Sequence, residues 1–130
     1  MIINCELDGT LCLFKSHRSP YDTAKGEDDL LCDVVSELIN GKNVILVSGR
    51  EDKFREKTER WLTKHNIEYI DLFMRQTGDN RNDAVVKQEI YDNHIKGKYD
   101  INFVLDDRDR VVKMWRDNGL KCLQVAEGNF

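Results

Sequence analysis

The chain has 130 residues, of which 40% are hydrophobic and 34% are charged, and its formal net charge is −4. This length predicts a single domain, residues 1–130, with a hydrophobic core of its own, and the composition is that of a globular protein rather than a disordered one. No apolar run approaches a membrane span and no signal-peptide pattern opens the chain, so we expect no membrane association. The net charge argues against a broad basic surface for duplex nucleic acid, although a few local arginines could still bind a strand end.

The four cysteines, Cys5, Cys12, Cys32 and Cys122, show neither Cys-x-x-Cys spacing nor a nearby histidine pair. Cys5 and Cys122 lie in apolar, strand-like runs, where a reduced and buried thiol is the usual state. A zinc site and a disulfide framework are both disfavoured. We therefore expect a reduced, intracellular protein.

The hydrophobic pattern predicts strands and helices in alternation. Met1 to Glu6 is predicted as a short buried strand, and the polar segment from about Leu11 to Glu27 as a loop. Apolar residues at helical spacing predict a helix from Asp28 to Asn40, which Gly41 ends. The later elements are predicted as a strand at Asn43–Val47, a helix at Glu51–His65, a strand at Ile67–Met74, a helix at Asp83–Ile95, a strand at Ile101–Leu105, a helix at Arg108–Asn118 and a strand at Lys121–Ala126.

Alternating strands and helices indicate an α/β fold, with a parallel Rossmann-like sheet between two layers of helices. In such sheets the active site lies at the carboxyl ends of the strands. Polar clusters follow four of the predicted strands: Glu6 and Asp8, then Ser48-Gly49-Arg50, then Arg75, and finally Asp106-Asp107. We therefore expect all four clusters to meet at one edge of the sheet.

The acidic residues in these clusters predict a Mg²⁺ site for phosphoryl chemistry. Mg²⁺ prefers a few carboxylates together with water and substrate oxygens, and Glu6 with one or both of Asp106 and Asp107 can supply the carboxylates. Acids at strand ends can instead cap the helices that follow them. For Asp106-Asp107 considered alone, helix capping and metal binding are equally good interpretations. The presence of Asp8-Gly9-Thr10 at another strand end makes the metal site the better one.

The remaining clusters suggest how a phosphate ester would be held and cleaved. Asp8, two residues beyond Glu6, could protonate a leaving alcohol and later activate water. Ser48 offers a hydroxyl, Gly49 lets backbone amides approach a phosphate oxygen, and Arg50 could clamp the phosphate through bidentate bonds.

Lys87 lies one helical turn after Asp83 and has two interpretations. It could be a phosphate ligand that Asp83 orients. The pattern alone favours a surface ion pair at i,i+4 spacing, which contributes only a few tenths of a kcal/mol.

Taken together, these motifs resemble those of the haloacid dehalogenase superfamily. The motifs are Glu6-Leu7-Asp8-Gly9-Thr10, Ser48-Gly49-Arg50, Lys87 and Asp106-Asp107. Further segments resemble the 3′-phosphatase domain of phage-type polynucleotide kinase/phosphatase, namely 18–22, 78–83, 111–116 and 124–130. The resemblance covers nearly the whole chain and implies a haloacid dehalogenase-like fold.

The resemblance also implies a role for each matching position. Glu6 stands where the family has the aspartate that is transiently phosphorylated, and Asp8 matches the general acid–base, whose carbonyl also contacts Mg²⁺. The other matching positions are the phosphate ligands Ser48 and Lys87, the metal-binding Asp107 with Asp106 beside it, and the substrate-site residues Arg18, Arg50, Arg75 and Asp83. The implied reaction is Mg²⁺-dependent hydrolysis of a 3′-phosphate, or a 2′,3′-cyclic phosphate, at a DNA or RNA end.

The same resemblance implies a setting for the reaction. It implies the cytoplasm of a bacterial or phage-infected cell and a kinase or ligase partner in end healing, and it leaves homo-oligomerisation open. The sequence contains no Gly-rich phosphate loop followed by Lys-Ser or Lys-Thr, the mark of a kinase half. We therefore expect a free-standing phosphatase or an excised phosphatase domain.

Glu6 departs from the family pattern. One extra methylene moves the carboxylate by roughly 1 Å, a misplacement that can cost about 100-fold in rate. Three explanations stay open: an engineered substitution, a natural enzyme with adjusted geometry, and a natural relative that only binds.

Two other functions therefore stand beside the 3′-phosphatase: a module that binds phosphorylated strand ends without chemistry, and a general small-molecule phosphatase. The short loop between Leu11 and Glu27 leaves no room for a large cap domain. An open site suits a polymer end better than a small metabolite.

Overall fold

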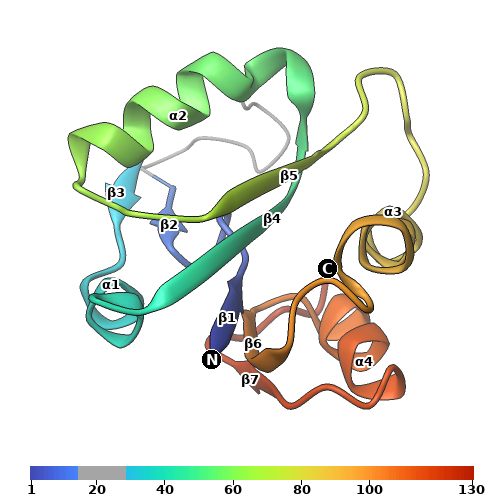
Figure 1. Ribbon diagram of the computed structural model, residues 1–130. Helices are drawn as coiled ribbons and strands as arrows, with labels where there is room; N and C mark the ends of the chain where they lie inside the picture. Colours follow the sequence, from blue (N-terminus) through green and yellow to red (C-terminus); the bar gives the residue numbers. More distant parts are fainter. Residues whose placement is uncertain (15–28) are drawn as a thin grey trace.

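The computed structural model describes residues 1–14 and 29–130 of the chain. Its centre is a parallel sheet of five strands in the order β5-β4-β1-β6-β7 (Figure 1). The strands are β1 (Ile2–Cys5), β4 (Asn43–Glu51), β5 (Asp71–Arg75), β6 (Ile101–Asp106) and β7 (Cys122–Gln124). The predicted α/β class and parallel sheet are confirmed.

Helices cover both faces of the sheet, so the molecule has three layers. In Figure 1, α1 (Asp33–Ile39) and α2 (Arg55–Lys64) lie on the left, and α3 (Asp83–Ile90) and α4 (Asp109–Asp117) on the right. A wider helical turn, η3 (Tyr91–Ile95), continues α3 to the end of the predicted helix.

Strand β4, which lies between β5 and β1, is buried on both faces because its side chains alternate between the two cores. Val44 and Leu46 pack with Trp61 and Leu62 of α2 on one face. Ile45 and Val47 pack in the second core, which includes residues of α3, η3 and α4. This arrangement confirms the prediction that the β-branched run is a strand buried on both sides.

Several predicted boundaries were wrong. Leu30 and Leu31 fit helical spacing, yet they form β3 (Leu30–Leu31), which pairs with β2 (Cys12–Leu13) in a small antiparallel sheet. Glu51 belongs to β4, and a 3₁₀ turn, η2 (Asp52–Phe54), precedes α2. β5 begins at Asp71 rather than Ile67. For Leu30 and Leu31, pairing with a distant segment overrides the local helical spacing. Hydrophobic periodicity alone does not reveal such a pairing.

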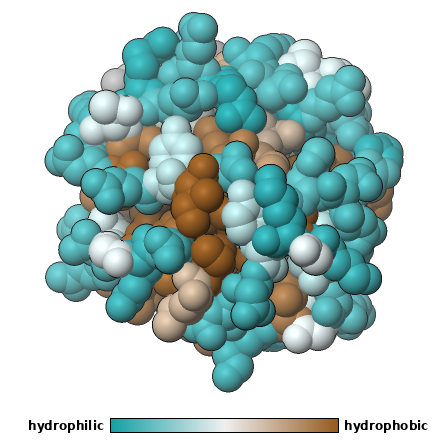
Figure 2. All heavy atoms as spheres, in the orientation of Figure 1, coloured by the Kyte–Doolittle hydropathy of each residue, from teal (hydrophilic) through white to brown (hydrophobic). Residues whose placement is uncertain are grey.

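The surface of the face shown in Figure 2 is largely hydrophilic, with an apolar group near its centre, where Figure 1 places β5 and β4. Residues 1–14 and 29–130 contain no large cap domain over the sheet. None of the helices described in these ranges is long and apolar enough to span a membrane. All four cysteines are free thiols.

Candidate active site

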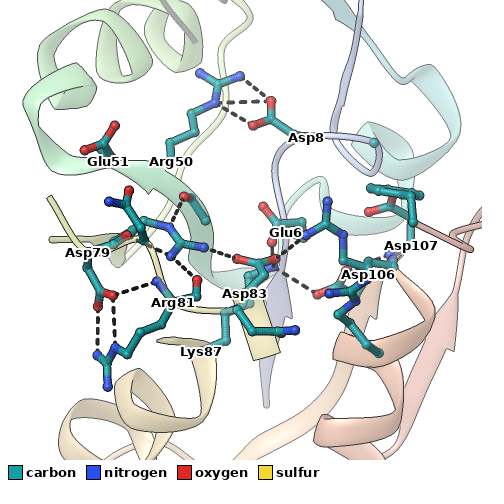
Figure 3. Close-up of a pocket in the computed structure, with 18 of the residues that line it drawn as sticks. Glu6, Asp8, Arg50, Glu51, Asp79, Arg81, Asp83, Lys87, Asp106 and Asp107 are labelled. Atoms are coloured by element: carbon teal, nitrogen blue, oxygen red, sulfur yellow. Dashed lines mark hydrogen bonds and ion pairs between the residues drawn. The ribbon is translucent and has the colours of Figure 1, made fainter. Parts of the chain in front are cut away.

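A cavity of about 460 Å³ lies at the carboxyl edge of the sheet. It collects side chains from the ends of β1, β4, β5 and β6, which confirms that the four clusters meet at one edge (Figure 3). The predicted site residues that line it are Glu6, Asp8, Gly49, Arg50, Arg75, Asp83, Lys87, Asp106 and Asp107. Ser48 is buried behind this lining, and Arg18 lies outside the described residues.

The turn after β1 is fixed against the end of β6. Gly9 has a positive φ of 82°, which favours glycine, and its N–H donates to the Cys12 carbonyl at 2.9 Å. A Cβ on Gly9 would lie 2.1 Å from Asp107 Oδ2, so no larger residue fits there. Thr10 Oγ1 donates to Asp107 Oδ1 at 3.1 Å. These contacts hold the first motif and the last acidic pair against one another.

Glu6 is buried at the base of the cavity, where its two carboxylate oxygens have different partners. Oε1 accepts a hydrogen bond from the Leu7 N–H at 2.8 Å. Oε2 forms an ion pair with Lys87 Nζ. The acid at the nucleophile position therefore contacts the cation that the resemblance assigns to phosphate.

Lys87 reaches this point from α3 and is almost completely buried. Its Nζ also lies 3.3 Å from Asp83 Oδ2 and 3.5 Å from Asp106 Oδ2. Burial lowers the pKa of the Lys87 ammonium, and the neighbouring acids Asp106 and Asp107 oppose that shift. The interpretation of Lys87 and Asp83 as a surface ion pair is therefore wrong.

The two acids of the last cluster differ in what they bind. Asp106 Oδ1 accepts from the N–H groups of Asp107 at 2.8 Å and Arg108 at 3.3 Å, just before α4. Its Oδ2 accepts from Trp115 Nε1 at 3.1 Å. Asp106 thus fixes the turn between β6 and α4 and contacts α4 through Trp115, but it does not cap the helix, because Arg108 is the N-cap residue and no side chain caps it.

Asp107 faces the cavity with fewer protein donors. Burial raises the pKa of its carboxyl to about 6, with a further contribution from the Asp106 charge. A bound cation would relieve both effects. The oxygen donors that fit Mg²⁺ are therefore the carboxylates of Glu6 and Asp107, with Asp8 close by in sequence.

Arg50 is predicted to clamp phosphate, but its guanidinium binds other protein groups. Its Nε and Nη2 donate to the Asp8 carboxylate, at 3.0 Å to Oδ2 and 2.6 Å to Oδ1. Nη2 also donates to Asp29 Oδ2 at 3.1 Å, and Nη1 donates to Thr58 Oγ1 at 3.2 Å. Arg50 lines the cavity, but these bonds make it a residue that positions Asp8.

Ser48 and Gly49 also have contacts within the protein that their sequence-based roles did not include. The Ser48 hydroxyl accepts from the Arg50 N–H at 3.1 Å. A Cβ on Gly49 would lie 2.3 Å from Asp83 Oδ1, so the glycine makes room for that carboxylate. The two residues shape the turn that presents Arg50 and admits Asp83 to the site.

Arg75 joins the end of β5 to the loop before α3. Its Nε donates to the Gly49 carbonyl at 2.8 Å, and Nη1 donates to the Asp79 and Arg81 carbonyls at 3.0 and 2.7 Å. Nη2 donates to Asp83 Oδ1 at 3.1 Å. Burial raises the pKa of Asp83, while the charges of Arg108 and Arg75 oppose that shift.

Sequence reasoning missed several residues of the site. Those that line the cavity include Phe14, Asp79, Arg81, Arg108, Arg110 and Phe130. Arg81, Arg108 and Phe130 stand in or beside segments that carry the family resemblance, and that signal could have found them. Nothing local marks Asp29 or Thr58, because only the fold brings them to Arg50.

One further group of possible metal ligands is Asp8, Cys12 and Asp29, whose ligand atoms lie within 4.8 Å of one another. The Arg50 guanidinium already binds both carboxylates. Burial also raises the pKa of the Cys12 thiol well above its usual value, which disfavours the thiolate that metals prefer. This group fits an arginine rather than a metal ion.

Comparison with known proteins gives matches at three levels. A family model described as the polynucleotide kinase PNKP phosphatase domain matches residues 1–130. A protein of Autographa californica nuclear polyhedrosis virus, named "Putative bifunctional polynucleotide kinase/RNA ligase", is 37% identical over 121 residues, which are 87% of this chain and 17% of that protein.

Among solved structures, a chain of a Pnkp1/Rnl/Hen1 RNA repair complex is 45% identical with a TM-score of 0.94, and the match covers 98% of this chain and 43% of that one. A second structure of the Pnkp1/Rnl/Hen1 complex gives 45% identity and a TM-score of 0.93, over 98% of this chain and 46% of that one. The chain therefore spans less than half the length of these relatives.

Proposed function

The chain belongs to the family of polynucleotide kinase PNKP phosphatase domains, and from that membership we propose that it removes a 3′-phosphate, or a 2′,3′-cyclic phosphate, from the end of a nucleic-acid strand with Mg²⁺. The observation that carries the proposal is the buried Lys87 ammonium beside Glu6, at the base of a cavity rimmed by arginines. A buried cation at the end of an open cavity can bind the phosphate of a strand end, while the strand itself stays outside.

The chemistry assigned to the side chains is displacement at phosphorus in two steps. A Glu6 oxygen attacks the phosphorus, the bond from phosphorus to the ribose oxygen breaks, and Asp8 gives that oxygen a proton. Water then attacks the phosphorus of the acyl-phosphate and gives its proton to Asp8, which frees Glu6 and inorganic phosphate. Bound Mg²⁺ would neutralise the charge on the phosphoryl oxygens, and Glu6 and Asp107 would hold it.

The remaining residues hold these groups in place. Arg50 orients the Asp8 carboxylate through the bonds described above, and Lys87 binds a phosphate oxygen. Asp83 and Asp106 keep Lys87 charged despite its burial. Asp106 is assigned to this support, and Asp107 to the metal, because both Asp106 oxygens already accept protein hydrogen bonds.

A second candidate function is binding of phosphorylated ends without hydrolysis. The ion pair between Glu6 and Lys87 favours it, because the carboxylate that should attack is held by the cation that should bind phosphate. A shorter aspartate would leave Lys87 to the substrate. Glu6 therefore decides between a working enzyme and a module that only binds.

The experiment that separates the two is phosphate release from a 3′-phosphorylated oligonucleotide with Mg²⁺, comparing the chain with Glu6→Asp. We expect Glu6→Asp to release phosphate about 100-fold faster, since the carboxylate returns to attacking distance. Glu6→Gln is the matched control and should release none. A folded Glu6→Asp protein without activity would remove Glu6 from the reaction and leave the binding function.

A small metabolite remains the alternative substrate, and two measurements address it. An oligonucleotide with a 3′-phosphate should bind more tightly than the same strand with a 3′-hydroxyl. It should also react with a higher kcat/KM than a nucleoside 3′-phosphate. Equal values in both comparisons would assign the site to small phosphate esters.

The setting of the activity is proposed from the relatives. The viral relative carries both kinase and ligase in its name, and the structural matches come from an RNA repair complex. We propose that this domain acts beside a kinase or ligase in healing strand ends, in the cytoplasm. Copurification with such enzymes is the measurement that checks it.

A further inference from the structure

Phe130 places an aromatic ring at the rim of the cavity. The residue is 47% exposed and lines the cavity. One side of the ring is covered by the Arg108 guanidinium, whose Cζ lies 4.4 Å from the ring centroid. The ring therefore still offers apolar surface to solvent beside a phosphate-binding pocket.

Two sets of contacts fix the ring: an ion pair of Arg108 and backbone hydrogen bonds of the segment that carries Phe130. Arg108 Nη1 lies 3.8 Å from Asp83 Oδ2 inside the site, which directs the guanidinium. On the other side, the Asp109 N–H donates to the Gly128 carbonyl at 2.9 Å, and the Phe130 N–H donates to the same carbonyl at 2.9 Å. A Cβ on Gly128 would lie 1.8 Å from the Asp107 carbonyl oxygen, so the segment before Phe130 packs directly on the acidic pair.

The surroundings of the ring match one part of a nucleotide. Arg110 is an exposed cation that lines the same cavity, and it suits a backbone phosphate of a strand. Lys87 at the base suits the terminal phosphate. A flat, partly exposed aromatic ring on the lining of the same cavity suits a nucleobase, because every base has a π-face that stacks on aromatic side chains.

We propose that Phe130 is a stacking platform for a nucleobase within the last three nucleosides of the bound strand. This inference rests on the proposed function and deepens it, since it makes the ligand a nucleotide chain rather than a phosphate ester alone. Stacking tolerates all four bases, so the platform would recognise an end without reading its sequence.

The test is a binding titration by fluorescence anisotropy, in Ca²⁺ so that oxygen ligands are filled while turnover is slowed. The probes are 3′-phosphorylated oligonucleotides with an abasic residue at each of the last three positions in turn, and the intact strand. We expect one abasic position to weaken binding of the unaltered protein by about 5- to 100-fold, the range of a lost base stack. Phe130→Leu should weaken binding of the intact strand by a similar factor and become insensitive to the abasic residue.

Two control variants separate stacking from a structural role. Phe130→Trp should retain affinity and sensitivity to the abasic residue. Leu38→Ala, which truncates an apolar residue of similar exposure outside the cavity lining, should bind every probe like the unaltered protein. If no abasic position matters while a 3′-phosphate still binds more tightly than a 3′-hydroxyl, the platform is wrong and the end-binding function stands. If the phosphate makes no difference, the proposed function itself fails.

Discussion

Two buried cations hold the two sides of the candidate site, and they do so in different ways. Arg50, at the end of β4, uses Nε, Nη1 and Nη2 as donors to Asp8, Asp29 and Thr58. Lys87, on α3, has one ammonium among three carboxylates, those of Glu6, Asp83 and Asp106. Both side chains are only 2% exposed, so solvent screens the charges of neither network.

The difference shows which side is built to change during a reaction. The planar guanidinium of Arg50 is matched by acceptors in fixed directions, which suits a support. Lys87 is a compact charge that Glu6, Asp83 and Asp106 share. Of these acids Arg75 and Arg108 pair with Asp83, so the carboxylates of Glu6 and Asp106, with Asp107 beside them, keep a negative charge that a metal ion can balance. A phosphate can then take the place of a carboxylate on the ammonium. The Lys87 side is therefore the reactive side, and the Arg50 side is its frame.

The largest expected effect comes from removing the Lys87 charge. Lys87→Met leaves Glu6, Asp83 and Asp106 buried without their shared cation, and we expect it to lower the free energy of unfolding by about 3–5 kcal/mol at neutral pH. Urea titration measures that loss. Because the cost is carboxylate repulsion, much of it should disappear as the pH is lowered and the acids take up protons.

Lys113→Met is the matched control for this variant. Lys113 pairs with Asp117 on the exposed surface of α4, so its removal should change the free energy of unfolding by less than about 1 kcal/mol. In protein that remains folded, Lys87→Met should also abolish the preference for a 3′-phosphate over a 3′-hydroxyl. Retained preference would move phosphate binding to another cation and remove the difference between the two networks.

A smaller effect on stability is expected from Arg50→Lys, which keeps the positive charge but removes the planar guanidinium and its several donors. A lysine cannot satisfy Asp8, Asp29 and Thr58 together, so we expect a loss of about 2–3 kcal/mol in the free energy of unfolding. Measured in the Glu6→Asp background, kcat should fall while the affinity for a 3′-phosphate stays within about threefold. Arg55→Lys, at a half-exposed ion pair with Glu59, is the control and should have little effect.

The same variant decides between support and clamp. If Arg50→Lys loses phosphate affinity and keeps kcat, Arg50 touches the substrate, as the sequence predicted. The comparison between a frame and a reactive side would then be wrong for this residue.

Sequence predicted the place of the site because strand ends in a parallel sheet share an edge. Glu6, Arg75 and Asp107 could be placed there from their positions after apolar runs alone. The roles within the site were harder to predict. Arg50 was assigned to phosphate from its place in the Ser48-Gly49-Arg50 cluster. Its bonds to Asp29 and Thr58 could not be predicted, because these partners lie 21 and 8 residues away and carry no motif.

The burial of individual side chains could not be predicted from hydrophobic periodicity either. Asp83 and Lys87 have the spacing of an exposed helical pair, and only the packing of α3 beside β4 makes that pair internal. The same holds for Leu30 and Leu31, which became a strand by pairing with β2. In each case a contact between distant segments decided the outcome.

The smallest expected effect concerns the pH dependence of stability and comes from Asp107. Its folded-state pKa of about 6 lies above the ordinary value of 3.8 for an aspartate, because burial and the Asp106 charge disfavour the carboxylate. A raised carboxyl pKa means that the folded state binds the proton more tightly than the unfolded chain does. This residue therefore contributes stability below about pH 4 that is lost as the pH rises through about 6.

Asp107→Asn removes that dependence, so the variant should gain stability relative to the unaltered protein between about pH 4 and pH 7. A shift of this size corresponds to at most about 3 kcal/mol, and because the cavity admits solvent we expect about 1–2 kcal/mol. Thermal unfolding in EDTA across this range measures it, with Asp117→Asn as the exposed control. A flat difference between Asp107→Asn and the unaltered protein would show that the excess negative charge is not concentrated on the Lys87 side, and the two networks would then be equivalent supports.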